Sequence, residues 1–186
     1  LRTFEYISPR IHLQEYKGTI VEFKKIERFP DEIDGFWRTA RSEFEATIER
    51  TATFLNWRFS RCFGNNLIYL ARSVERGEIA GYMVLRKTKS ANVENILDIV
   101  DLHALPWEDK CILTLVNEAV AICKEEGLDM IHCRFPRWHK YADILHRFGF
   151  VSMDRTFRLM NMFQPRLIFY NLDEKEELPK TRQWFY

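Results

Sequence analysis

Three carboxylates and one histidine in the middle of the sequence could carry acid–base chemistry. They are Glu78, Asp98, Asp101 and His103. Strict alternation along a strand puts Asp98 on the face of residues 100 and 102, and Asp101 with Ile99 and His103 on the other. Asp101 could then raise the imidazole pKa and form an acid–base pair with His103. The alternative is a hydrogen-bonded strand-end histidine without a catalytic role.

The cysteines give a weaker signal. His132 and Cys133 are adjacent in an apolar segment, so strand geometry directs them to opposite faces and they cannot act as base and nucleophile. Cys111 lies near a predicted helix start, where a thiolate is stabilised, but Asp109 opposes this. The cysteines lack C-x-x-C spacing, so we predict buried free thiols rather than disulfides or zinc, and a reducing, cytoplasmic location. The four are Cys62, Cys111, Cys123 and Cys133.

Hydrophobic periodicity predicts the elements that position these residues. Apolar runs at 78–86 and 95–102 predict strands, and the short polar segment 87–92 predicts an antiparallel hairpin. From 107 to 126 apolar residues recur at three- and four-residue steps, which indicates an amphipathic helix ended by Gly127. Residues 128–135 are then a buried strand. A strand–helix–strand passage of this length requires a right-handed parallel crossover, so the sheet is mixed.

Further elements are predicted around this core. A last amphipathic helix carries five apolar residues on one side, and Gly149 forms its C-terminal turn; the five are Trp138, Tyr141, Ala142, Leu145 and Phe148. The others are an edge strand at 19–26, a helix from its cap Asp31 to Arg41, a helix at 44–59, strands at 67–71 and 151–163, and a last short strand at 184–186.

Composition limits the classes of function. With 186 residues and 46% hydrophobic content, the chain predicts one domain over 1–186, with its core at about 19–165 and a C-terminal extension at 166–186. The 28 basic and 27 acidic residues are interspersed, which gives no general attraction to nucleic acid or to anionic membranes. The apolar runs are shorter than the ~20 residues of a membrane-spanning helix. Because Leu1 is not methionine, we expect a piece of a longer protein.

Four segments resemble the GCN5-related N-acetyltransferase superfamily. They are FLNWRF at 54–59, GEIAGYMV at 77–84, IVDL at 99–102 and RFGF at 147–150. More narrowly, they are similar to the C-terminal domain of a divergent bacterial and archaeal branch. The resemblance covers roughly residues 50–165 and rests on order and spacing. It implies an α/β (α+β) fold, with a mixed, mostly antiparallel sheet between helices. Two parallel strands, ending near Leu105 and Phe135, splay apart.

The resemblance also implies a site for acetyl-CoA in this gap. The pantetheine arm would lie against the first strand and the pyrophosphate at the start of the long helix. The residues implied to bind it are Leu102, Ala104, Leu105, Lys110, Cys111 and Arg137. The family has a glycine-rich turn here, whereas LPWEDKCI at 105–112 has no glycine. Pro106 lacks a donor N–H, Trp107 blocks close approach, and Glu108 and Asp109 place negative charge where the phosphates would lie. The alternative role of these two carboxylates is to complement the dipole at the helix start.

The family positions for catalysis are changed as well. Many members have an asparagine at the start of the last helix and a tyrosine general acid near its end, where this sequence has His139 and Leu145. Tyr141, one turn earlier, is our candidate for the general acid, with core packing as the alternative. Asp101 and His103 are the candidates for the base.

The resulting hypothesis is an enzyme, an N-acyltransferase that moves an acetyl or related acyl group from acyl-CoA to an amine by direct attack. The acceptor would be a small molecule or a peptide, and a homodimer is compatible with it. The alternative is a non-catalytic module of this fold that has lost the pyrophosphate loop. Transfer from aminoacyl-tRNA is disfavoured because no basic groove is visible.

Overall fold

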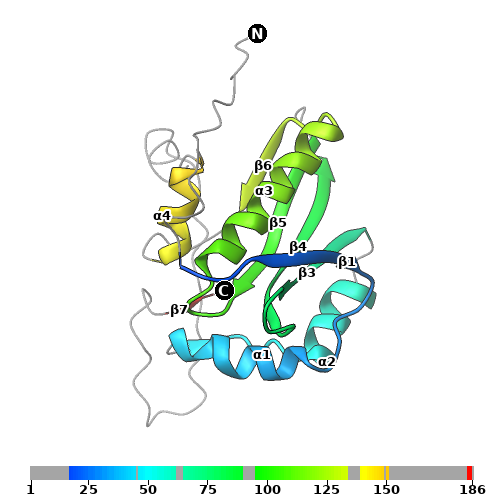
Figure 1. The fold of residues 1–186 in the computed structure, drawn as a ribbon. Coiled ribbons are helices and arrows are strands. Elements are labelled where there is room, and N and C mark those ends of the chain that lie inside the picture. The colour runs from blue at the N-terminus through cyan, green and yellow to red at the C-terminus, as the bar shows by residue number, and fades with distance from the viewer. Residues whose placement is uncertain are drawn as a thin grey trace, which may run out of the picture.

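Five strands form the central sheet, in the order β1–β3–β4–β5–β6 (Figure 1). The structure, a computed structural model, describes residues 17–44, 46–61, 65–89, 95–133, 139–148, 150 and 184–185. The strands are β1 (Val21–Ile26), β3 (Asn66–Ser73), β4 (Ile79–Lys89), β5 (Asn95–Ala104) and β6 (Met130–Cys133). Neighbours are antiparallel except β5 and β6, which are parallel. The predicted mixed, mostly antiparallel sheet is confirmed.

Helices cover both faces of this sheet, as predicted. Helices α3 (Asp109–Glu125) and α4 (Lys140–Arg147) share one apolar core with the sheet residues under them. Helices α1 (Ile33–Ala40) and α2 (Ala52–Leu55), with the π-helical turn Asn56–Arg61 that continues α2, share a second core on the opposite face. Each core removes apolar surface from water, so the sheet is held from both sides.

The amphipathic helix predicted at 107–126 corresponds to α3. Gly127 ends it with φ +60°, a conformation that glycine adopts without steric cost. The predicted last helix corresponds to α4, in which Tyr141 and Leu145 are buried, as is its C-terminal cap residue Phe148. Trp138, Gly149 and the strand predicted at 151–163 lie outside the described residues.

Three local predictions are wrong. Residues 44 and 46–51 are not helical. Arg41–Glu43 form a 3-10 turn and Ala46–Thr47 form β2. Helix α2 begins only after Thr51, whose hydroxyl accepts a hydrogen bond from the Phe54 amide at 3.3 Å. Asp31 does not cap α1, because the residue at the cap is Glu32 and no side chain caps it. Strand β6 is only partly buried, with Met130 40% exposed.

The short strand predicted at the end of the chain is present as β7 (Trp184–Phe185). It pairs in parallel with β2, so it forms a separate two-stranded sheet instead of extending the central one. Among the described residues, no helix has both the length and the apolar character needed to cross a bilayer.

The backbone of β4 at Gly81 packs tightly against its neighbours. A Cβ added at Gly81 would lie 2.6 Å from the Cys111 sulfur of α3 and 2.7 Å from the backbone oxygen of His103 in β5. A side chain here would therefore push α3 and β5 away from β4. The absence of a side chain at this position allows the three elements to pack at their observed distance.

We expect Gly81→Ala to lower the free energy of unfolding by roughly 1–3 kcal/mol, because the clash involves backbone that cannot rotate away. Gly35→Ala in α1 is the matched control. Its Cβ would meet only Arg38, at 3.8 Å, and the helix would gain up to about 1 kcal/mol. Urea denaturation of both variants measures the difference. A Gly81→Ala variant as stable as the parent would contradict this packing.

Candidate functional site

Within the described residues, the pairing of β5 with β6 covers only the first part of β5. The pairing runs from Ile96 with Met130 to Ile99 with Cys133, whereas β5 continues to Ala104. Directly after Ile99, the register with β4 shifts, because Val84 pairs with Asp101 and Leu85 with Ile99. Val100 is thus the extra residue of a β-bulge, which bends and twists a strand locally. We call the region beside β5 from Val100 to Ala104 the fork.

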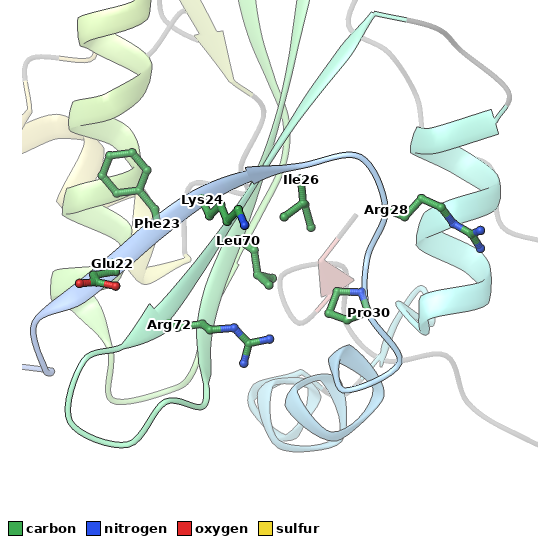
Figure 2. A pocket seen from close by; sticks show the side chains of 8 residues that line it. All are labelled: Glu22, Phe23, Lys24, Ile26, Arg28, Pro30, Leu70 and Arg72. Atoms are coloured by element: carbon green, nitrogen blue, oxygen red, sulfur yellow. The ribbon is translucent and has the colours of Figure 1, made fainter.

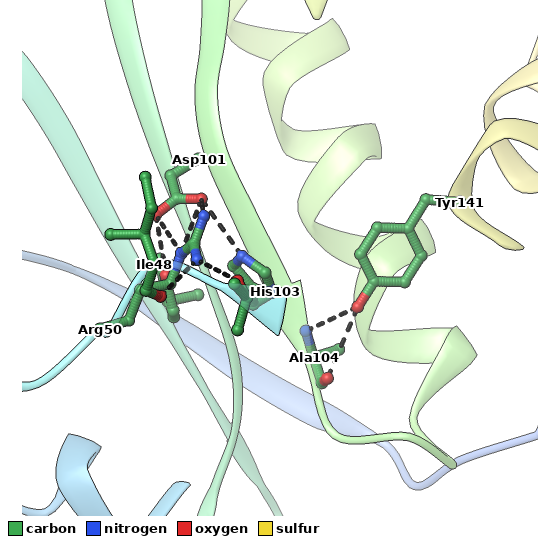
Figure 3. A network of polar contacts seen from close by, with 8 residues as sticks. Ile48, Arg50, Asp101, His103, Ala104 and Tyr141 are labelled. Carbon is green, nitrogen blue, oxygen red and sulfur yellow. Dashed lines mark hydrogen bonds and ion pairs between the residues drawn. The ribbon is translucent and has the colours of Figure 1, made fainter. Parts of the chain in front are cut away.

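Tyr141 covers β5 at the end of the fork. The Leu105 amide donates to Ala80 of β4, so by alternation Ala104 directs its own amide and carbonyl away from β4. The Ala104 amide donates to the Tyr141 hydroxyl at 3.0 Å, and this hydroxyl donates to the Ala104 carbonyl at 3.5 Å (Figure 3). A tyrosine side chain therefore occupies the outward backbone groups of β5 at Ala104.

Tyr141 is fixed by the burial of its side chain and by a hydrogen bond of its backbone amide. It is only 1% exposed, and burial raises its pKa well above the ordinary value of 10, so the phenol stays protonated at neutral pH. The Tyr141 amide donates to Nδ1 of His139 at 3.3 Å, which makes His139 the cap of α4. Burial lowers the pKa of His139 to about 3, so its ring is neutral and can accept this bond.

A buried charged network lies on the opposite face of β5 (Figure 3). The Arg50 guanidinium donates to both oxygens of Asp101, with Nε 3.1 Å from Oδ2 and 3.3 Å from Oδ1. The Tyr82 hydroxyl donates to the same carboxylate at 2.9 Å, and His103 Nε2 lies 3.3 Å from Oδ1. Trp37 packs its ring 5.2 Å from the Arg50 guanidinium. Asp101 thus has three neighbours that favour its charged form.

The pKa values of this network differ from the prediction. Burial alone would raise the pKa of Asp101, but Arg50 and His103 outweigh it and hold the carboxyl well below its ordinary range. For His103, burial and the Arg50 charge together exceed the attraction of Asp101 and lower the pKa to about 4. The predicted raised imidazole pKa is therefore wrong. At neutral pH, Asp101 is charged and His103 is neutral.

The bulge also changes the faces of β5. Ile99 and Leu102 belong to the same apolar core, under α3 and α4, although strict alternation would separate them. Asp101 and His103 follow the bulge, so they still share a face, but Asp101 does not share it with Ile99 as predicted. Asp98, before the bulge, accepts from Thr88 at 2.6 Å and lies 2.7 Å from His132. Glu78 forms a half-exposed ion pair with Arg76.

We expect the free energy of unfolding to decrease as the pH falls from about 6.5 to 4. In this range the unfolded chain binds a proton at His103 that the folded chain does not bind, so acid favours unfolding. His139 acts in the same direction. His103→Gln should remove about one proton from the difference in protons bound by the unfolded and folded chains. The slope of the free energy of unfolding against pH should then fall by at most about 1.4 kcal/mol per pH unit. Equal slopes in urea titrations of parent and variant would contradict it.

The start of α3 is closed by the segment that leads into β1 (Figure 1). The Lys17 carbonyl accepts from the Lys110 amide in the first turn at 3.0 Å. The Glu108 carboxylate, fully buried, accepts from the Thr19 amide at 2.8 Å and the Thr19 hydroxyl at 3.2 Å. Arg76 donates to it at 2.9 Å. Glu108 is thus buried and paired with Arg76. From the sequence, only an interaction with the helix dipole was considered for it.

Two carboxylates pair with Arg76 and offer a matched comparison. Glu108 is fully buried, whereas Glu78 is 47% exposed at 3.0 Å from the same guanidinium. We expect Glu108→Gln to lower the free energy of unfolding by roughly 1.5–3 kcal/mol, the range for hydrogen bonds to charged groups. Glu78→Gln should cost about 0–1 kcal/mol, since solvent screens an exposed pair. Thermal and urea unfolding at neutral pH measure both, and equal losses would contradict the role given to Glu108.

The residues predicted to bind acetyl-CoA are brought together only in part. Leu102 and Ala104 face the core under α3 and α4. The amides of Leu105 and Lys110 are already bonded, to Ala80 and Lys17. The Cys111 amide donates to the Glu108 carbonyl. Burial raises the pKa of the Cys111 thiol, which agrees with the predicted buried free thiol and not with a thiolate. Arg137 lies outside the described residues.

Arg50 and Tyr82 were not predicted as site residues. Arg50 lies in a segment that was predicted to be helical, and Tyr82 in an apolar strand. The signal that could have identified them is Asp101 itself, because a carboxylate in an otherwise apolar strand requires a cation or hydrogen-bond donors when it is buried. Which residues supply them depends on the fold, since Arg50 is 51 positions away.

A surface hollow of about 550 Å³ lies elsewhere, between β1, β3 and the loop before α1 (Figure 2). Lys24 and Arg72 point toward it, and Ile26, Leu70 and Pro30 form its apolar part. The Arg72 guanidinium is bound to the Glu32 carboxylate at 2.9 Å, so its charge is already neutralised. The hollow does not include residues of the fork or of the Asp101 network.

Comparison with solved structures identifies proteins of the same architecture. A ribosomal-protein-alanine N-acetyltransferase from Brucella melitensis biovar Abortus 2308 aligns with a TM-score of 0.57 and 11% identity, over 81% of this chain and 100% of its own. An aminoglycoside acetyltransferase from an uncultured soil metagenomic sample aligns with a TM-score of 0.51 and 14% identity, over 82% and 97%. A probable acetyltransferase gives 0.51 and 14%, over 86% and 100%.

The sequence itself gives no such match. No protein-family model matches it, and no curated protein is similar to it in sequence. At 11–14% identity the structural likeness shows the fold alone. This chain has the acyl-CoA N-acyltransferase fold, which confirms the fold that the resemblance implied.

Proposed function

We propose that this chain is an N-acyltransferase, which moves an acyl group from a thioester to an amine at the fork of its acyltransferase fold. The observation that carries the proposal is the contact of the Tyr141 hydroxyl with the outward amide and carbonyl of Ala104. This contact places a protonated phenol beside backbone groups that can bind an extended ligand. The amine acceptor is not assigned.

Ala104 offers one donor and one acceptor on the side of β5 that faces away from β4. An amide of an extended pantetheine arm can pair with both groups in the manner of an added strand. In this structure the Tyr141 hydroxyl satisfies them, as a buried backbone amide requires. A bound arm would take over these bonds and leave the phenol beside it.

The phenol can then supply the proton that the leaving group needs. Transfer forms a bond between the amine nitrogen and the acyl carbon and breaks the bond between this carbon and sulfur. The sulfur leaves with the electron pair and takes the Tyr141 proton, and the proton lost by the amine returns to the phenolate through solvent. The raised pKa of Tyr141 keeps the hydroxyl protonated until this step.

We assign Asp101 and His103 to positioning β5. Asp101 is committed to Arg50 and Tyr82, and the low pKa of His103 makes it a weak base. Both side chains lie on the face of α1, whereas Tyr141 and Ala104 belong to the opposite core. The network therefore supports the fork without sharing its chemistry.

A second candidate is a non-catalytic module of this fold that binds a partner. The closed start of α3 favours it, because the diphosphate of coenzyme A does not fit there. Lys17 holds the Lys110 amide, Glu108 places a carboxylate at the same point, and a Cβ at Gly18 would lie 2.6 Å from the Glu108 oxygen. The two candidates share the fold and differ in whether a thioester binds at the fork.

We expect Tyr141→Phe to lower kcat for acyl transfer by about 100-fold or more, since general acid catalysis contributes 10²–10⁴. The substrates are acetyl-CoA and S-acetyl-pantetheine, with a panel of small amines, aminoglycosides and peptides as acceptors. Tyr69→Phe is the matched control. It removes a phenolic oxygen from β3, which is separated from β5 by β4, and should retain the parent kcat.

The outcomes separate the two candidates. A thioester at a hundred times its Kd should stabilise the protein by about 2.7 kcal/mol, which a thermal shift detects. No shift with either thioester at millimolar concentration, together with no transfer, would favour the non-catalytic module. A Tyr141→Phe variant with full kcat would remove Tyr141 from the mechanism.

A further inference from the structure

We propose that the acyl donor of this chain is recognised without its nucleotide, because the start of α3 is a closed joint that takes no phosphate. This inference rests on the proposed function and defines its donor as a pantetheine thioester. The adenosine and diphosphate of coenzyme A would contribute nothing to binding at α3. The joint consists of Lys17, Gly18, Thr19, Arg76 and Glu108.

The position of α3 makes its start the natural place for the charged end of a ligand in the fork. Helix α3 follows β5 after a short turn, so a ligand that lies along β5 past Ala104 reaches its first residues. Free amides and the helix dipole attract anions at such an end. A fold that places a helix start here therefore offers a phosphate site by default.

In this chain three amides around that start already have acceptors. The Lys110 amide donates to the Lys17 carbonyl at 3.0 Å, the Cys111 amide to the Glu108 carbonyl at 3.0 Å, and the Glu108 amide to the Leu105 carbonyl at 2.9 Å. Pro106 has no amide hydrogen to offer. A phosphate would have to displace protein carbonyls from two helix amides before it could bind them.

The charge of Glu108 also opposes a phosphate at this point. The Glu108 carboxylate is fully buried at this point and accepts three hydrogen bonds, from the Thr19 amide, the Thr19 hydroxyl and Arg76. The chain thus supplies its own anion and the partners that stabilise it. A diphosphate placed beside it would meet a like charge in a poorly hydrated environment.

The covering segment fits only in its present form. Gly18 has φ +124°, which side-chain-bearing residues rarely adopt. Its backbone also packs so closely on Glu108 that an added Cβ would lie 2.6 Å from Oε2 and 3.1 Å from the α-carbon of that residue. Gly18 therefore packs tightly against both the side chain and the backbone of Glu108. Residues 17–19 act as a fixed part of the α3 start.

The first arm of the test compares two donors in the full chain. We expect acetyl-CoA and S-acetyl-pantetheine to have kcat/KM values within about threefold of each other, because the groups that differ are not contacted. A preference of more than about tenfold for acetyl-CoA, equivalent to roughly 1.4 kcal/mol, would overturn the inference.

The second arm does not depend on activity. Amide resonances of Lys110 and Cys111 are followed by NMR while 3′-phospho-ADP, the nucleotide portion of coenzyme A, is added to millimolar concentration. We expect no change at either amide. A saturable shift at Lys110 would show that phosphate reaches the α3 start and would overturn the closed joint, whatever the activity.

The two arms also separate this inference from the proposed function. If neither thioester supports transfer while Lys110 stays unperturbed, the closed joint is supported and the acyltransferase proposal fails. If acetyl-CoA alone supports transfer and 3′-phospho-ADP shifts Lys110, the acyltransferase proposal is supported and the closed joint fails.

Discussion

The ion pair between Arg50 and Asp101 is the interaction on which the arrangement around β5 depends. It ties the chain before α2 to the first residue after the bulge, inside a core from which water is excluded. A buried ion pair with one partner missing costs more than the pair contributes, roughly 3–5 kcal/mol, so each member fixes the other. Tyr82 and His103 complete the environment of the carboxylate. With one face of β5 held in this way, the strand presents the backbone of Ala104 to Tyr141.

Local pattern was sufficient for much of the fold and insufficient where distant segments meet. The β4–β5 hairpin and α3 repeat apolar residues at the period of their own structure, so they could be predicted from the sequence. The segment around Arg50 could not, because Arg50 binds Asp101, which lies 51 positions away in the sequence. The bulge at Val100 has no signature in the letters either, and it moved Ile99 to the face of Leu102.

The same division applies to the site. Asp101 and His103 were correctly placed as neighbours, since both follow the bulge and alternate normally. Their pKa values depend on Arg50 and on burial, which spacing cannot reveal, so the imidazole shifted in the opposite direction to the prediction. The glycine-free turn at 105–112 was visible in the sequence. The contacts of Lys17 and Thr19 with this turn depend on the tertiary structure, because they follow from the place where β1 enters the sheet.

The hydrogen bonds between the Tyr141 hydroxyl and the Ala104 backbone also affect the free energy of ligand binding. Any ligand that pairs with this backbone competes with a group of the same chain, which is present at a high effective concentration. An exchange of one set of hydrogen bonds for another yields little net free energy, at most about 0.5–1.5 kcal/mol per bond. Occupancy of the fork must therefore be driven by apolar burial of the ligand, and the strength of self-occupation by Tyr141 sets a threshold that weak or poorly shaped ligands fail to reach.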